Sequence, residues 1–595
     1  MDKSYDSIPM GVVLKTLGSE IKEFKFDSIM TPVSMIFEVI MEMIIPYLMA
    51  SIIDRGVTVG DTGHIRSTGA VMVVVAFLGL LSGIMGAHFG AKASAGLAKN
   101  LRNRMFGNIQ NYSFPNLDKY STAGLVTRLT TDVSNVQNAY QMILRMFMRA
   151  PSSIIIAMVM AFYINARLSF IYLLAVLFLA VFVFVLMGRV TKYFAEVFTK
   201  YDDLNESVQE NVSGIRVVKA FVREEYEKKK FFSATDNIYR MFVRAEKMVI
   251  LNMPVMQFTV YACILLLSWF GANMIVGGSL TTGELMSLLA YCMNILMSLM
   301  MLSMIFVMVS MSSASARRIT EVILETPVIK NPEDPVYEVK DGSIVFEKVS
   351  FSYYGEKGGR VLKDIDLEIK SGETIGMIGG TGSSKSSLIN LISRLYDVTA
   401  GSVKVGGRDV REYDLKALRD NVAHVLQKNE LFSGTILDNL RWGREDATEE
   451  ECREACALSC ADEFIERFPG KYETMIEQGG ANLSGGQKQR LCIARALLKK
   501  PKILILDDST SAVDTATDAK IRQGFRKYIP GTTKIIIAQR ISSVMDADRI
   551  IVMDDGRISG FAPHSELLEN NSIYRDVYES QFSGAGLSDF DEQGT

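Results

Sequence analysis

The chain has 595 residues, of which 48% are hydrophobic and 22% charged, with a formal net charge of −3. This length is too great for one ordinary domain, and the lack of a basic block argues against a nucleic-acid-binding protein. The six cysteines are scattered along the chain, unlike those of a small secreted disulfide protein, so reduced thiols are expected.

A polar, charged segment from Met1 to Asp27 precedes the first apolar run. A cleavable signal peptide is shorter and begins its apolar run earlier, so residues 1–27 are expected to remain as an N-terminal cytoplasmic segment. The apolar residues then lie almost entirely before Arg317. Because a helix needs about 20 mostly apolar residues to cross the bilayer core, residues 28–316 are predicted to form a transmembrane domain.

This domain is predicted to cross the membrane six times. The predicted spans are residues 28–53, 70–92, 144–165, 168–190, 248–276 and 284–314. The connectors on one side are short and poor in Lys and Arg, whereas residues 92–149 and 189–247 are long and basic. Basic loops stay in the cytoplasm, which predicts a multi-pass protein of the plasma (inner) membrane with both termini cytoplasmic.

The two long basic connectors are expected to continue the helices beyond the bilayer. Turns near Asn116–Leu125 and Asn205–Ile215 are then available to contact ATPase domains in the cytoplasm.

Two carboxylates, Glu38 and Glu42, lie one helical turn apart inside the first span. Intramembrane carboxylates are costly and usually face the bundle interior or water. Two interpretations remain open, namely binding of a cationic substrate and a structural role between helices.

After Arg317 the pattern changes from apolar helices to a soluble domain. Prolines mark a polar linker over residues 317–342, and the soluble domain extends over residues 343–582. Short β-branched runs alternate there with helical segments, at residues 373–378, 422–426, 503–506, 534–538 and 549–553. Strands separated by helices predict a mostly parallel sheet of the α/β type. The Gly- and Asp-rich residues 583–595 are expected to form a disordered tail.

A glycine-rich loop follows the first of these strands. Its residues are Gly379, Gly380, Thr381, Gly382, Ser383, Ser384, Lys385, Ser386 and Ser387. The pattern is that of a P-loop, in which backbone N–H groups surround phosphates, Lys385 reaches the β/γ-phosphates and Ser386 ligates Mg²⁺. Ser384 departs from the pattern, because the second glycine is normally found at this position.

Two further motifs follow the P-loop in the chain. The apolar strand at 503–506 ends in Asp507, an arrangement that holds Mg²⁺ through the carboxylate. Between the two lies Leu483-Ser484-Gly485-Gly486-Gln487. In this order the motifs resemble those of ABC ATPases, and six spans followed by one such domain resemble an ABC half-exporter. The resemblance implies a membrane α-helical bundle with long cytoplasmic extensions plus a cytoplasmic α/β P-loop ABC ATPase domain that binds ATP and Mg²⁺.

The same resemblance gives roles to further residues. Tyr353 matches the aromatic residue that stacks on adenine, and Gln427 matches the glutamine that joins Ser386 and Asp507 at Mg²⁺. In the family, each ATP is held by the P-loop of one domain and the signature of another, here Ser484, Gly485, Gly486 and Gln487. A second ABC half-transporter chain is therefore expected as a partner.

Two positions of the expected catalytic machinery differ from the family pattern. Asp508 stands where the family has a glutamate that polarises the attacking water, and a misplacement of about 1 Å can cost about 10²-fold in rate. Gln539 stands where the family has a histidine, and an amide cannot carry the imidazolium charge. The chain therefore resembles the degenerate-site subunit of bacterial heterodimeric multidrug exporters, whose own site binds ATP but hydrolyses it slowly.

The resulting prediction is an ATP-driven exporter in the lipid bilayer that moves small amphipathic molecules or lipids out of the cytoplasm by alternating access. Two alternatives remain open: a regulatory subunit that senses ATP without supporting transport, and a peptide exporter. Cys452, Cys456 and Cys460 repeat at helical spacing. They could in principle hold a metal, but with no fourth ligand evident a buried helix stripe is predicted instead.

Overall fold

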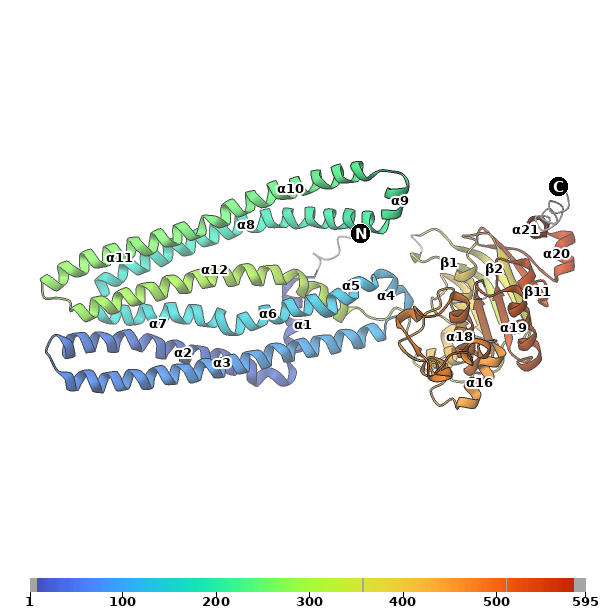
Figure 1. The fold of residues 1–595 in the computed structure, drawn as a ribbon, viewed down its shortest axis with the longest axis horizontal. Helices are drawn as coiled ribbons and strands as arrows, with labels where there is room; N and C mark the ends of the chain where they lie inside the picture. Colours follow the sequence, from blue (N-terminus) through green and yellow to red (C-terminus); the bar gives the residue numbers. More distant parts are fainter. Residues whose placement is uncertain (1–7, 356–357, 510, 583–595) are drawn as a thin grey trace. The chain divides into compact units, whose positions relative to one another are not determined.

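The computed structural model describes residues 8–355, 358–509 and 511–582. The chain divides into two compact units. The first, the helical unit, comprises Met1–Asn111 and Ser121–Glu325, and the second, the ATPase unit, comprises Tyr112–Tyr120 and Thr326–Thr595. All the strands that the structure describes belong to the ATPase unit (Figure 1). The predicted tail at 583–595 lies outside the described residues.

The helical unit is built from long and short helices, several of which lie side by side (Figure 1). They are α1 (Met10–Ser19), α2 (Lys25–Ser51), α3 (Thr62–Gln110), α5 (Thr122–Thr127), α6 (Val133–Met142), α7 (Met148–Ile164), α8 (Ala166–Ser213), α9 (Ile215–Ala220), α10 (Glu224–Ile250), α11 (Asn252–Val276) and α12 (Thr282–Leu324).

Within the described residues, 6 helical segments are long and apolar enough to cross a membrane, judged by length and composition. They are Lys22–Val57, Thr62–Gln110, Thr122–Ile164, Ala166–Val190, Glu224–Val276 and Thr282–Leu302. Each overlaps one predicted span, so the prediction of a six-helix membrane domain is confirmed.

The helices also continue beyond the spans, as expected, and the second predicted turn comes only at the end of its predicted range. The first turn falls at the short helix α4 (Phe114–Lys119). The second does not begin at residue 205, because α8 remains helical to Ser213 and the chain turns only at Gly214. No Gly or Pro occurs between Gly188 and Gly214, so nothing in that stretch interrupts the helix.

Buried tyrosines join the spans in the interior of the helical unit. Tyr172 donates a 2.9 Å hydrogen bond to the Leu288 carbonyl oxygen, and Tyr291 donates one of 2.8 Å to that of Met43. Both side chains are at most 1% exposed. Polar groups in an apolar interior need such partners, so these bonds fix the packing of α12 against α8 and α2.

The ATPase unit contains two main sheets. The larger has the order β12-β11-β3-β10-β9-β6. Its strands are β3 (Thr374–Gly379), β6 (Val422–Val425), β9 (Ile503–Asp507), β10 (Thr533–Ile537), β11 (Arg549–Asp554) and β12 (Arg557–Ala562). The first five match the predicted strands within one residue at each end and pair in parallel, whereas β12 is an antiparallel edge strand.

The second sheet was not predicted from the sequence. It is antiparallel, in the order β2-β1-β4-β5, and β7 and β8 form a separate two-stranded antiparallel sheet. The strands of these two sheets are β1 (Ile344–Phe351), β2 (Leu362–Ile369), β4 (Ala400–Val405), β5 (Arg408–Asp409), β7 (Gly434–Thr435) and β8 (Met475–Ile476).

Helices cover the sheets of the ATPase unit and form its hydrophobic cores. They are α13 (Lys385–Ile392), α14 (Leu415–Asn421), α15 (Ile436–Arg441), α16 (Glu449–Leu458), α17 (Asp462–Ile465), α18 (Gly485–Leu498), α19 (Thr515–Tyr528), α20 (His564–Asn570) and α21 (Ser572–Phe582). Cys452, Cys456 and Cys460 are at most 9% exposed within one of these cores, which confirms their burial. Only Cys452 and Cys456 lie on one helix, because α16 ends at Leu458 and Cys460 has a φ of +55°. Among the described residues, no group of three or more His, Cys, Asp or Glu side chains could hold a metal ion.

Candidate active site

The predicted motifs meet at one edge of the larger sheet. β10 pairs in parallel with both β3 and β9, with Ile537 opposite Met377 on one side and Asp507 on the other. The carboxyl ends of these strands therefore lie together, as at ligand sites of other parallel sheets. The P-loop follows β3, Asp507 ends β9 and Gln539 follows β10, so the sheet brings all three to one place.

A cavity of about 570 Å³ opens at this edge. Its lining includes every residue of the P-loop from Gly379 to Ser387, together with Gln427, Asp507, Asp508 and Gln539. Two predicted elements do not line it, namely Tyr353 and the signature residues from Ser484 to Gln487.

The P-loop backbone adopts conformations that explain its glycines. A Cβ atom on Gly379 would lie 2.4 Å from the Met553 carbonyl oxygen, so no side chain fits there. Gly382 has a φ of +84°, in the left-handed region that favours glycine. Ser384 has a φ of +74° in the same region, immediately before α13. The serine therefore replaces a glycine where the backbone itself favours glycine, at a cost of about 1 kcal/mol.

Lys385 lies within the loop. Its ammonium donates hydrogen bonds to the carbonyl oxygens of Gly379, at 2.7 Å, and Gly380, at 2.9 Å. Burial lowers the pKa of Lys385, while the nearby Asp507 and Asp508 act in the opposite direction. The positive charge is thus held by weak neutral acceptors at the phosphate-binding loop, where an anion would stabilise it better.

Oxygen-bearing side chains gather beside the lysine. Asp507 is 7% exposed, burial raises its pKa, and a hydrogen bond from Ser386 lowers it. Burial also raises the pKa of Asp508. A hard divalent cation would relieve this cost, and Ser386, Asp507 and Gln427 offer the oxygen ligands that Mg²⁺ prefers. Mg²⁺ at this place would neutralise phosphate charge during phosphoryl transfer.

Asp508 and Gln539 contact each other directly. The Gln539 amide nitrogen Nε2 donates to Oδ2 of Asp508 at 2.9 Å. Asp508 has a φ of +47°, and its backbone N–H donates to the Ile537 carbonyl oxygen at 3.1 Å. The sequence singled out both residues separately but gave no sign of this bond, which depends on the pairing of β9 with β10.

The signature begins α18. The Ser484 N–H donates to Oε1 of Gln487 at 2.9 Å, forming one half of a capping box. On the same helix, Gln489 accepts a hydrogen bond of 3.0 Å from the Ala512 N–H and donates one of 3.2 Å to Ser511 Oγ. The sequence analysis did not single out Gln489, which attaches the signature helix to the loop after Asp508.

Tyr353 lies outside the cavity but contacts α13. Its hydroxyl is 2.9 Å from Ser387 Oγ, and its ring packs edge-on against Tyr396 with centroids 5.1 Å apart. The Tyr396 hydroxyl donates a 2.6 Å hydrogen bond to Asp118 on α4, and its ring also packs against Phe114. Sequence reasoning missed Tyr396, which connects the predicted adenine-stacking residue to α4 within the ATPase unit.

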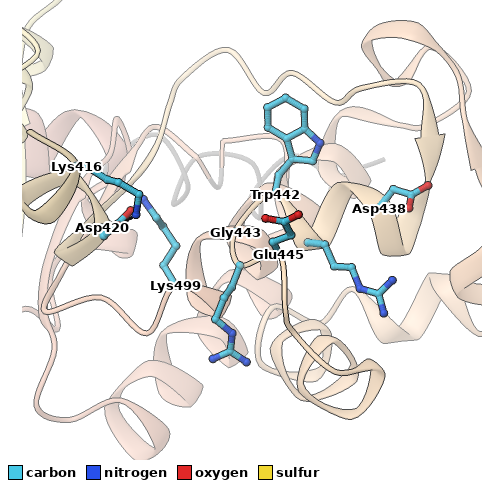
Figure 2. A pocket seen from close by; sticks show the side chains of 9 residues that line it. Lys416, Asp420, Asp438, Trp442, Gly443, Glu445 and Lys499 are labelled. Carbon is cyan, nitrogen blue, oxygen red and sulfur yellow. Dashed lines mark hydrogen bonds and ion pairs between the residues drawn. The ribbon is translucent and has the colours of Figure 1, made fainter.

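A larger cavity, of about 820 Å³, lies elsewhere on the same unit and contains none of the predicted site residues. Figure 2 shows Lys416, Asp420 and Lys499 on one side of it and Asp438 on the other, with Trp442 between them. Lys416 and Asp420 form an ion pair at 2.6 Å. The lining contains no glycine-rich loop and mixes both charges, so it does not suit a polyphosphate.

Comparison with known proteins identifies the family. Residues 28–318 match the ABC transporter transmembrane region, and residues 362–511 match the ABC transporter family. YfiB of Bacillus subtilis, an uncharacterized ABC transporter ATP-binding protein, is 36% identical over 552 residues, or 93% of this chain and 96% of that protein. This chain belongs to the ABC transporter family.

Other relatives of this transporter extend over nearly the whole chain. An uncharacterized ABC transporter ATP-binding protein of Mycobacterium tuberculosis is 35% identical over 575 residues, or 96% of this chain and 98% of that protein. An ATP-dependent lipid A-core flippase of Hahella chejuensis is 30% identical over 521 residues, 86% of this chain and 88% of that protein. This transporter is therefore an ATP-hydrolysing half-transporter of the exporter type, whose ATPase domain binds ATP, normally with Mg²⁺.

Proposed function

We propose that this transporter is one subunit of a heterodimeric exporter that moves amphipathic small molecules or lipids out of the cytoplasm by alternating access. Its own ATP site binds nucleotide but hydrolyses it slowly, and its signature completes the competent site of a partner chain. The observation that carries the proposal is the hydrogen bond from Gln539 to Asp508.

The Asp508–Gln539 bond supports slow hydrolysis for two reasons. The Asp508 carboxylate is one methylene shorter than that of a glutamate, and one of its oxygens is already bonded to an amide. A general base must reach the proton that it accepts, and a misplacement of about 1 Å can lower the rate of the chemical step about 10²-fold. In addition, Gln539 can donate hydrogen bonds but supplies no positive charge to the γ-phosphate.

The signature supports a role in a partner's site. Ser484 and Gly485 are exposed and do not line this chain's own cavity. They lie at the first turn of a helix of 14 residues, where unpaired N–H groups and the helix dipole favour an anion. A phosphate held by another chain fits this position.

Two observations support an exporter of amphipathic molecules in the plasma (inner) membrane. Relatives from Hahella chejuensis and Desulfotalea psychrophila are named ATP-dependent lipid A-core flippases, so by name they act on a lipid. The basic connectors between the spans support cytoplasmic termini, since such loops stay in the cytoplasm.

The test compares two variants in the complex purified with its native partner. Ser484→Arg should reduce ATP turnover on the order of 10²–10³-fold, because it removes a donor from the partner's site. Asp508→Ala should reduce turnover no more than about threefold, since the slow site carries little of the flux. Ser580→Arg, at an exposed position on α21, is the control and should leave turnover unchanged. Rapid ATP hydrolysis by the unmodified chain alone would overturn the heterodimer proposal and leave the family assignment intact.

A further inference from the structure

The N-terminal helix α1 and the turn after it carry an apolar stripe. Met10, Val13, Leu14, Leu17 and Ile21 recur at helical spacing, so their side chains share one face. Val13 is fully buried, whereas Leu14 is 65% exposed. A helix of this kind is typical of the boundary between membrane and water, where its apolar face enters the acyl region.

This stripe closes one side of a cavity of about 680 Å³ inside the helical unit. Its other apolar walls include Leu97, Val136, Ala139, Ile143, Val309 and Ala316. The volume lies in the range of about 300–1,000 Å³ that is common for small-molecule sites.

The polar groups in the lining already have partners. The Tyr140 hydroxyl donates a 2.8 Å hydrogen bond to Ser28 Oγ, and Ser312 Oγ donates one of 3.0 Å to the Met308 carbonyl oxygen. Ser313 also has an interaction partner. Tyr140 and Ser312 have thus used their only donor hydrogens, so a ligand group that accepts hydrogen bonds would find no donor in them and would lose free energy on burial, whereas an apolar chain would not.

The cavity lies at the ends of several membrane-spanning segments. The α1 helix ends shortly before α2 begins the first span, and Ile143 lies five residues before α7 in the third. The remaining walls come from α3, α6 and α12, which belong to the second, third and sixth spans. A cavity near the predicted ends of membrane spans lies at the depth where the abundant apolar chains are those of phospholipids.

Positive charges flank the lining. Lys15 lies on α1 outside its apolar stripe, Lys22 lies in the turn after α1, and Lys99 lies on α3. Lys22 is 2.6 Å from Glu20 and Lys99 is 4.0 Å from Glu23, so a phosphate near either lysine would compete with a carboxylate. All three lysines are exposed. Lysines at the membrane boundary attract lipid phosphates, so the surroundings complement a phospholipid headgroup as the lining complements its tail.

We propose that this cavity binds one acyl chain of a phospholipid from the surrounding leaflet, with its phosphate near these lysines. The bound lipid attaches α1 to α3, α6 and α12, and it is distinct from the transported substrate. The inference rests on the spans and on this cavity, and it is independent of the heterodimer proposal.

The first experiment fills the cavity and counts bound lipid. The purified full-length complex is titrated with palmitoyl-oleoyl phosphatidylglycerol, and retained lipids are counted by native mass spectrometry. Ala139→Phe excludes about three methylene groups and should weaken binding of one lipid per chain roughly 50-fold. Leu174→Phe, at a position 68% exposed on α8, is the matched control and should retain that lipid. Equal lipid counts in both variants would overturn the proposal.

The second experiment does not depend on how well the filled variant folds. Leu17→Trp, in a chain whose Trp269 and Trp442 are replaced by Phe, is reconstituted into vesicles of phosphatidylglycerol with brominated acyl chains. Bromine quenches nearby indole fluorescence, so the tryptophan should be quenched, and the quenching should fall when Ala139→Phe is added. Quenching that Ala139→Phe leaves unchanged would mean that α1 only lies on the bilayer. Absence of quenching would mean that a protein segment, and not an acyl chain, covers the tryptophan at position 17. This result would also refute the proposal.

Discussion

The amide of Gln539 donates a hydrogen bond to the carboxylate of Asp508 across 2.9 Å. The two residues follow the ends of neighbouring strands, β10 and β9, and both line the cavity at the P-loop. Each of them occupies a position that the resemblance to ABC ATPases gives to a catalytic side chain. Because they bond to each other, the two departures from the family pattern form one local arrangement rather than two unrelated changes.

This arrangement predicts that the two residues must be replaced together. Asp508→Glu combined with Gln539→His should raise ATP turnover of the chain expressed alone by about tenfold, since it restores both reach and charge. The gain in rate is expected to stay below the ~10²-fold loss that a misplaced base causes, because Ser384 remains in the P-loop. Phosphate release in detergent measures the rate. Asp555→Glu, at an exposed carboxylate bonded to Lys363, is the control. A double variant no faster than the unmodified chain would contradict the proposed cause of slow hydrolysis.

The sequence predicted the parallel strands and the site motifs closely, because buried β-branched runs and glycine-rich loops are local signals. The antiparallel sheet was missed because its strands are irregular. In β1 the pairing shifts register between Phe346 and Val349, and Lys348 has a φ of +47°, so the alternation of apolar and polar residues is broken. Contacts such as that of Gln539 with Asp508 depend on tertiary pairing and leave no local pattern.

The conformation of Ser384 predicts a stabilising substitution. Ser384→Gly should relieve strain of about 1 kcal/mol, partly offset by the greater freedom of glycine in the unfolded chain, for a net gain of about 0.5 kcal/mol. Thermal unfolding of the purified chain measures the change. Thr381→Gly is the matched control, because residue 381 has no positive φ and glycine there should destabilise by about 0.5–1 kcal/mol. Equal losses in the two variants would show that strain at Ser384 is unimportant.

The histidine of β6, His424, predicts a loss of stability in acid because its ring nitrogens are buried. Both ring nitrogens of His424 are inaccessible and lack partners, and burial lowers its pKa to about 4. A lowered pKa means that the stability from the neutral ring is fully present above about pH 6.5 and is lost as the pH falls towards 4. The loss amounts to about 3 kcal/mol at most.

Unfolding midpoints between pH 7 and pH 5 measure this effect. His424→Phe should flatten the pH dependence, because the ring no longer takes up a proton. The control is His564→Asn, which removes a histidine whose Nδ1 is bonded to the Tyr574 hydroxyl at 2.7 Å. An unchanged slope in His424→Phe would assign the acid sensitivity to other groups.

The bond between Tyr396 and Asp118 predicts a coupling defect. Burial raises the pKa of Tyr396, and the carboxylate of Asp118 raises it further. The hydroxyl therefore remains a donor at neutral pH. Tyr396→Phe keeps the ring contacts with Tyr353 and Phe114 but removes the 2.6 Å bond to α4. Hydrogen bonds to charged groups contribute about 1.5–3 kcal/mol, so transport should fall about tenfold while ATP affinity changes less than about twofold. ATP-driven uptake into vesicles measures transport. The control is Tyr337→Phe, which changes a tyrosine that is 69% exposed.

The carboxylates of the first span bind an arginine that the sequence analysis did not consider. Arg149 on α7 donates to Oε1 of Glu38 at 2.7 Å and to Oε2 of Glu42 at 2.8 Å. The three side chains are 20–39% exposed, so water reaches them in the single chain. Charged groups inside a membrane pair in this way, and this cluster keeps one excess negative charge. The cation-binding interpretation of Glu38 and Glu42 therefore requires a substrate that competes with Arg149.

That requirement predicts opposite effects of two variants on the export of cations. Glu38→Gln with Glu42→Gln turns the cluster positive and should lower cation export about tenfold, since like charges repel in a medium of low dielectric constant. Arg149→Gln leaves two negative charges and should maintain or increase cation export. Neither variant should alter export of a neutral amphipathic substrate more than about twofold, because a neutral molecule gains little from the net charge. Vesicle transport of matched cationic and neutral dyes measures both, with thermal unfolding to detect the destabilisation that an unpaired Arg149 would cause. Equal changes for the two dyes would leave the cluster a purely structural role between α2 and α7.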